Sequence, residues 1–127
     1  MTAPTANTTP AIDIQPDQWA IVRDILQKHV PGHVVWAFGS RATGTAKPFS
    51  DLDLAVISEH PMSLDLGAHL GEDFSQSNLP WRVDVVDWAS SSDVFRAIIA
   101  RDKVVIQQPL AQPEGPEPDR APNKELP

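Results

Sequence analysis

Apolar residues recur at helical spacing in three stretches of the chain. The first stretch covers residues 16–30, where Pro16 suits a first helical turn and the Pro31-Gly32 pair ends the pattern. A second helix is expected over residues 63–76, and a third begins at a serine cap and ends near residue 101. We expect these helices to bury Trp19, Val22, Ile25, Leu26, Leu64, Leu66, Leu70, Phe74, Phe95, Ile98 and Ile99.

Short runs of β-branched, apolar and aromatic residues lie between the predicted helices, and such runs are typical of strands. They cover residues 33–38, 51–57 and 82–88, and residues 104–106 are expected to add a short edge strand. Strands that alternate with helices in this way predict a small mixed β-sheet flanked by helices, which is an α/β (α+β) fold.

The chain of 127 residues is expected to form one domain, because a second core would need more residues. We expect a disordered N-terminal extension over residues 1–14, a folded domain over residues 15–107 and a disordered, acidic, proline-rich tail over residues 108–127. The composition of the two ends cannot bury enough apolar surface to offset the entropy of ordering them.

The formal net charge of −7 disfavours direct binding to nucleic acid, which needs a basic surface. A basic protein partner or a metal-screened nucleotide fits this charge better. The chain has no cysteine, so disulfides and thiolate chemistry are excluded and a reducing compartment is favoured. No apolar stretch reaches the roughly 18–20 residues that span a bilayer, and the first residues lack a signal-peptide pattern. We therefore expect a soluble cytoplasmic protein with no membrane contact.

Gly39 and Ser40 follow the first predicted strand, where the chain turns towards an expected short helix. The missing side chain of Gly39 lets another group approach the backbone. The amides of such a turn, the Ser40 hydroxyl and the positive end of a helix can all face a phosphate. Ser40 could equally cap the helix. Arg41 is either a nucleotide-binding residue at the phosphates or the partner of a surface acid.

Asp51 and Asp53 follow the Gly-Ser pair after ten further residues. On a strand their side chains point to one face, while Leu52 and Leu54 point to the other. Two neighbouring carboxylates repel each other unless a cation lies between them, and oxygen-only ligands favour Mg²⁺. Beside a phosphate-binding turn, this pair predicts phosphoryl or nucleotidyl transfer. The alternative is a solvent-facing strand edge of alternating polarity.

A third acid, Asp84, interrupts the otherwise apolar strand over residues 82–88, where a charge without a partner is costly. If this strand lies beside residues 51–57, Asp84 can reach the same metal and take a proton from an attacking hydroxyl. The alternative is a surface position on a half-exposed strand. Asp87 faces the opposite side from Asp84, and we expect it at the surface or in a cap.

The spacing of the turn and the acids resembles the DNA polymerase beta-like nucleotidyltransferase superfamily, and most closely its minimal members, the MNT antitoxins encoded beside HEPN toxins. The residues that carry this resemblance are Gly39, Ser40, Asp51, Asp53 and Asp84. The resemblance implies that ATP is the substrate, that the turn holds its phosphates and that Mg²⁺ binds the three acids. It also implies AMP transfer to a tyrosine hydroxyl of a HEPN ribonuclease toxin, and therefore a hetero-oligomer.

Two other functions stay open from the sequence. The chain could be a non-catalytic antitoxin that neutralises its partner by forming a complex, or a nucleotidyltransferase that acts on a small molecule. The three acids argue against the first function, because a pure binding protein has no reason to keep like charges together. A chain of this length leaves no room for the extra acceptor domain of the small-molecule enzymes, which argues against the second function.

Overall fold

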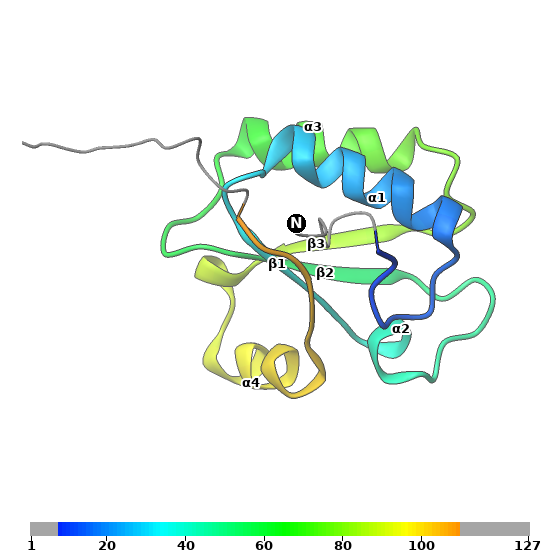
Figure 1. Cartoon of the computed structure of the whole chain (residues 1–127). Coiled ribbons are helices and arrows are strands. Elements are labelled where there is room, and N and C mark those ends of the chain that lie inside the picture. The colour runs from blue at the N-terminus through cyan, green and yellow to red at the C-terminus, as the bar shows by residue number, and fades with distance from the viewer. Residues whose placement is uncertain (1–7, 110–127) are drawn as a thin grey trace, which may run out of the picture.

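A four-stranded mixed sheet lies at the centre of the computed structural model, which describes residues 8–109 (Figure 1). The strand order is β3-β2-β1-β4, in which β2 is antiparallel to β1 and parallel to β3, and β4 is antiparallel to β1. The strands are β1 (Val34–Phe38), β2 (Leu52–Ile57), β3 (Val83–Asp87) and β4 (Val104–Gln107). The predicted mixed sheet, including its short edge strand, is confirmed.

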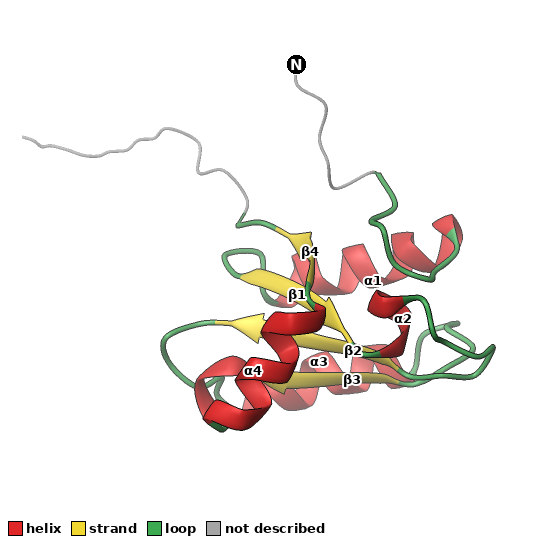
Figure 2. Cartoon of the chain, turned by 90° about the horizontal axis from the view of Figure 1, so that it is seen from below, coloured by secondary structure: helices red, strands yellow, loops and turns green. Residues whose placement is uncertain are grey.

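Helices cover both faces of this sheet. Figure 1 shows α1 (Pro16–His29) and α3 (Leu64–Ser75) side by side on one face and α4 (Asp93–Asp102) on the other. Seen from below in Figure 2, α4 lies in front of the sheet with α1 and α3 behind it. The short helix α2 (Ser40–Thr43) follows β1, and the 3-10 helix η2 (Trp88–Ser90) follows β3. The sheet flanked by helices is therefore confirmed as well.

The two faces of β2 belong to different environments, because successive side chains alternate across a strand. Leu52, Leu54 and Val56 are fully buried against α1 and α3, in the main core. Ala55 points the other way and packs in a smaller core with Ile99 of α4. Burial of each leucine contributes roughly 2 kcal/mol to folding, so β2 is anchored mainly through its α1/α3 face. The opposite face is left available for polar side chains.

Local capping explains where the helices begin. The Ser63 hydroxyl accepts the Leu66 amide at 3.1 Å, and the Ser92 hydroxyl accepts the Phe95 amide at 3.1 Å. These bonds satisfy amides that have no partner inside the helix. Pro16 occupies the first turn of α1, as its fixed φ predicts. The predicted serine cap before α4 is confirmed, and Ser92 rather than Ser91 provides it.

Two predicted core positions are wrong. Leu64 is 91% exposed and Ile98 is 38% exposed. The buried stripe of α3 runs through Leu70 and Phe74, which are four residues apart, and Leu64 lies about 240° around the helix from Leu70. Ile98 lies about 100° from the buried Ile99, which places its side chain at the rim of the α4 interface.

The folded domain begins before residue 15, which corrects the predicted boundary. Ile14 is buried in the main core and Ile12 packs against it. The Asp13 amide donates to the Arg41 carbonyl at 2.8 Å, so this segment is also held through its backbone. The predicted disorder of residues 1–7 and 110–127 lies outside the described residues. No helix within residues 8–109 has the length and apolar character that a membrane span requires.

Candidate active site

The turn between β1 and α2 requires glycine at position 39. Gly39 has φ 77° and ψ −160°, a conformation that side chains rarely adopt. A Cβ at this position would also collide with the Asp53 Oδ2 atom on the neighbouring strand. The Gly39 carbonyl accepts the amides of Ala42 and Thr43, at 3.0 and 3.1 Å, and so starts the short helix that the sequence predicts. Gly39 therefore lies in contact distance of a candidate catalytic carboxylate.

Ser40 is the first residue of α2, and the cap position belongs to Gly39. The Ser40 carbonyl accepts the amides of Gly44 and Thr45, both at 3.0 Å, which close the short helix. Its hydroxyl caps no helix, so the capping alternative for Ser40 does not hold. The side chain is half-buried beside the turn, where a phosphate contact remains a prediction.

The predicted acids lie on one face of the sheet. The parallel pairing of β2 and β3 places Asp53 directly beside Asp84, and neighbouring strands are about 4.8 Å apart. Asp51 precedes β2 and shares the face of Asp53, because Leu52 between them is fully buried on the opposite face. This face is the one that α4 partly covers. The structure therefore brings Asp53 and Asp84 together, with Asp51 on the same face just before the start of β2.

The charges of these acids interact. Burial first, then Asp84 and then Asp51 raise the pKa of Asp53 from 3.8 to about 6. A neighbouring carboxylate raises a pKa because it makes a second negative charge harder to form. A cation beside Asp53 would therefore remove the repulsion between these carboxylates.

Carboxylate oxygens are the ligands that Mg²⁺ prefers in proteins, so this donor set fits that ion. Within residues 8–109, no three His, Asp or Glu side chains converge in the geometry of a preformed metal site. The metal set of Asp51, Asp53 and Asp84 therefore stays a prediction, and the geometry itself establishes the pair of Asp53 and Asp84 with Asp51 adjacent.

We expect the metal-free protein to lose stability as the pH rises from about 4 to about 6. The pKa of Asp53 is raised in the folded state, so folding binds a proton more tightly than the unfolded chain does in this window. The loss should be of the order of 1 kcal/mol, because solvent screens a half-exposed carboxylate. Denaturant unfolding in a chelator should show this slope, and Asp53→Asn should flatten it. Parallel pH profiles for the two proteins would contradict the assignment.

Arg41 has a different set of contacts from the predicted phosphate contact. Arg41 is 5% exposed, and its guanidinium carbon Cζ lies 4.4 Å from the centre of the Trp81 ring. Nε donates to the Ser50 carbonyl at 2.9 Å and Nη1 to the Asp13 carbonyl at 2.9 Å. Nη2 donates to the Pro48 carbonyl at 3.1 Å. Arg41 thus fastens the segment before α1 and the loop before Asp51 to α2, and a direct phosphate contact would break these bonds.

Two residues near the acids were not predicted from the sequence. Arg82 precedes Asp84 by two residues, so it lies on the face of the sheet that carries Asp51, Asp53 and Asp84, here called the acid face. The alternation that selected the acids would also have selected Arg82. Asp102, at the end of α4, accepts a hydrogen bond from the Gly39 backbone. Arg101 holds the pKa of Asp102 below its usual range through hydrogen bonds at 2.8 and 3.3 Å. No local pattern could place Asp102 beside Gly39, because that contact depends on the packing of α4.

Asp87 is confirmed as a capping residue away from the other acids. Its Oδ1 accepts the Ala89 amide at 3.3 Å at the start of η2. Its Oδ2 accepts the Met62 amide at 2.9 Å and the Ser90 hydroxyl at 3.1 Å. These bonds hold the end of β3 to the segment before α3, so Asp87 has a structural position.

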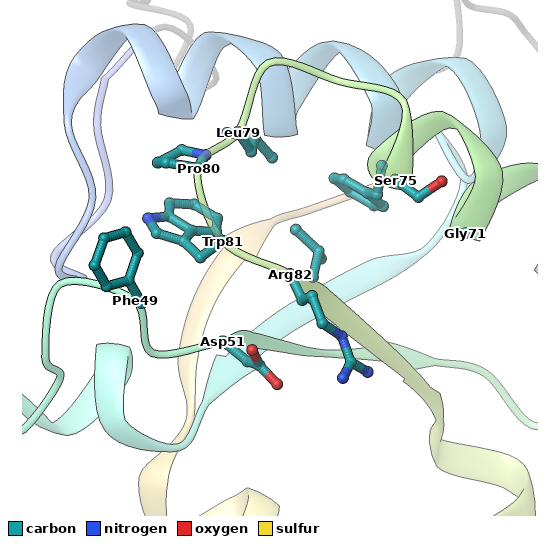
Figure 3. A pocket seen from close by; sticks show the side chains of 10 residues that line it. Phe49, Asp51, Gly71, Ser75, Leu79, Pro80, Trp81 and Arg82 are labelled. Carbon is teal, nitrogen blue, oxygen red and sulfur yellow. The ribbon is translucent and has the colours of Figure 1, made fainter.

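A cavity of about 450 Å³ adjoins the acids where β2 and β3 begin (Figure 3). Its wall includes Phe49, Asp51, Leu79, Trp81 and Arg82. Asp51 and Arg82 extend to the same side of the strands in Figure 3. Gly71, Phe74 and Ser75 of α3 complete this wall, so the cavity lies mainly beside α3 and meets the acid face at Asp51 and Arg82. Its volume lies in the range of small-ligand sites.

The sequence profile described as Polymerase beta, Nucleotidyltransferase matches residues 21–109, which include the glycine turn and the three acids. The chain belongs to the polymerase beta nucleotidyltransferase family. This membership confirms the predicted resemblance and the predicted enzyme class. The chain is 55% identical over 97 residues to a probable protein adenylyltransferase, MntA, of Haemophilus influenzae. The match covers 76% of this chain and 85% of that protein.

Solved structures share the fold of the polymerase beta nucleotidyltransferase family with this chain. A toxin–antitoxin crystal structure with AMP-PNP matches with a TM-score of 0.61 and 24% identity, over 70% of this chain and 72% of the other. A tri-AMPylated HEPN toxin of Shewanella oneidensis in complex with an MNT antitoxin matches with a TM-score of 0.54 and 22% identity, over 68% and 66%. At these identities the matches establish the fold.

Proposed function

We propose that this protein transfers AMP from ATP to a hydroxyl group of a partner protein, and that the transfer silences the partner as an antitoxin does. The observation that carries the proposal is the pairing of Asp53 with Asp84 beside the Gly39 turn. The 55% identity to a probable protein adenylyltransferase supports AMP as the transferred group and a protein as the acceptor.

The reaction joins an acceptor oxygen to the α-phosphorus of ATP. As that bond forms, the bond from the α-phosphorus to the oxygen of the β-phosphate breaks, and pyrophosphate leaves. Asp84 is exposed on the acid face, so it can take the proton of the attacking hydroxyl. Gly39 and Ser40 form the turn that we assign to the phosphates, and the missing side chain of Gly39 leaves room in this turn beside Asp53. The remaining rate enhancement comes from orientation of the two reactants.

The acids Asp51 and Asp53, with Asp84 beside them, are the residues that would hold Mg²⁺. Bound there, the ion supplies positive charge that neutralises the phosphates and the charge that develops on the leaving pyrophosphate. The raised pKa of Asp53 supports this assignment, because a cation bound there would offset the repulsion from Asp84 and Asp51 that contributes to it.

We assign the acceptor to a HEPN-family ribonuclease toxin and, within it, to a tyrosine hydroxyl. Structures that share the fold contain a HEPN toxin with an MNT antitoxin, which supports a hetero-oligomer of the same kind. The net charge of −7 suits a basic protein partner and opposes direct contact with nucleic acid.

The deciding experiment is mass spectrometry of the partner encoded beside this protein, after incubation with the protein, ATP and Mg²⁺. We expect the partner to gain one or more AMP units and to lose ribonuclease activity. Asp84→Asn, which removes the base but keeps the size of the side chain, should lower the rate at least 100-fold. Peptide sequencing of the product identifies the modified hydroxyl.

The alternative outcomes are also specific. A stable complex that neutralises the toxin without any gain in mass would replace transfer with antitoxin action by binding alone. Transfer of AMP to a small-molecule hydroxyl without a partner protein would replace the protein acceptor. A chelator should stop the reaction reversibly, and activity that persists in a chelator would remove Mg²⁺ from the proposal.

A further inference from the structure

Arg82 continues the acid face by one position towards the cavity. The pairing of Leu52 with Val83 and of Asp53 with Asp84 sets the register of the two parallel strands. The Leu52 amide donates to the Arg82 carbonyl at 2.9 Å, so the pairing extends to the residue before β3. Arg82 therefore lies on the same face as Asp84, two residues before it in the chain and beside Asp51.

The guanidinium of Arg82 is exposed and uncommitted. Its side chain makes no hydrogen bond or ion pair with any other residue between positions 8 and 109, and it lines the cavity with Asp51 (Figure 3). Other cations are engaged: Arg41 binds backbone carbonyls, and Arg96 donates to the carbonyls of Trp88 and Ala89 at 2.9 and 3.2 Å. Arg82 is thus a cation of the acid face that is free to bind a ligand.

A guanidinium is suited to phosphate, because it can donate two parallel hydrogen bonds to the oxygens. If Arg82 served only to balance Asp51, the two groups should form an ion pair, yet within the described part of the chain Arg82 has none. The cavity beside it has a volume of about 450 Å³ and an exposed aromatic wall residue, Phe49, whereas Trp81 is buried beside the Arg41 guanidinium. Aromatic side chains pack against flat rings such as nucleobases.

We infer that Arg82 and the adjoining cavity form a phosphate-binding subsite for a nucleotide, and this inference rests on the proposed function. The phosphate has two sources. It belongs either to the incoming ATP, or to an AMP already joined to the acceptor, whose ribose hydroxyl would receive the next AMP. In both cases Arg82 holds a phosphate beside the acids and so orients the nucleotide for attack.

The test compares Arg82→Gln and Arg82→Lys with the intact protein. Lys28→Gln is the matched control, since it removes one positive charge from α1, on the opposite face of the sheet. Four quantities are measured: the equilibrium affinities for AMP-PNP and for AMP, each with Mg²⁺, and the rates of the first and of the second AMP addition to the partner. Arg82 is exposed, so the unfolding midpoint should stay unchanged in both variants.

Phosphate binding from ATP predicts that Arg82→Gln weakens AMP-PNP binding at least tenfold, with a smaller effect on AMP and partial recovery in Arg82→Lys. Phosphate binding from an attached AMP predicts normal AMP-PNP affinity and a normal first addition, with the second addition at least tenfold slower. Changes below twofold in all four quantities, as expected for Lys28→Gln, would overturn the subsite. Weakened AMP-PNP binding in a protein that modifies no partner would keep the subsite and reject the proposed function.

Discussion

Asp53→Asn is expected to abolish AMP transfer and, at the same time, to stabilise the metal-free protein. Asp53 lies between Asp84 and Asp51, and its pKa of about 6 reflects burial and repulsion from both neighbours. Removing its charge relieves that repulsion, which should add about 1 kcal/mol at neutral pH after allowance for solvent screening. The transfer rate should fall at least 10³-fold, because the proposed Mg²⁺ site would lose one of its carboxylate ligands.

The two effects are measured on the same preparations, by AMP incorporation into the partner and by unfolding in a chelator. Glu59→Gln removes one negative charge from the exposed loop after β2 and should change neither quantity. If Asp53→Asn lost activity and stability together, the acid would be a structural residue. Transfer within tenfold of the intact protein would show that the reaction does not depend on Asp53.

Gly39→Ala is expected to lower both the rate of AMP transfer and the stability of the protein, with the larger effect on the rate. The alanine would be strained at φ 77°, and its Cβ would push the Asp53 carboxylate away from its place beside Asp84. We expect a loss of about 2 kcal/mol in unfolding free energy and a fall of about 100-fold in transfer rate, since small displacements of reacting groups are costly.

Gly44→Ala separates strain from collision. Gly44 has φ 83°, and a Cβ there would meet no atom within 4 Å. This variant should lose about 1 kcal/mol of stability and keep its transfer rate. Equal activity losses in the two variants would assign the effect of Gly39 to strain in the turn alone, and the contact with Asp53 would then be unimportant.

Periodicity predicted much of the fold because it reports local constraints. The helical stripe through Trp19, Val22 and Leu26 and the cap at Ser92 are decided within one or two turns, and the structure has both. Alternation likewise placed Asp51 and Asp53 on one face of β2. The pairing of Asp53 with Asp84 required the further assumption that their strands are neighbours, which the register confirms.

The contacts that the sequence did not reveal depend on tertiary packing. Arg41 was expected at a phosphate because it follows the turn, yet its donors reach carbonyls of Asp13, Pro48 and Ser50, which only the folded chain gathers around it. Asp102 reaches Gly39 only because α4 packs back onto the sheet. Ile14 was assigned to a disordered extension, since Ile12 and Ile14 alone, next to a segment of small and polar residues, are too few to give a periodic signal.

The alternation along β2 also determines where the chain can tolerate the insertion of a single residue. One added residue in the exposed loop at positions 45–49 leaves the order of side chains within β2 unchanged. One residue added between Leu52 and Asp53 would shift every later side chain of β2 to the opposite face. Asp53 would then point into the hydrophobic core and Leu54 towards the acid face. β2 thus presents apolar side chains on one face and the candidate site acid on the other, so an insertion within this strand would exchange the two faces.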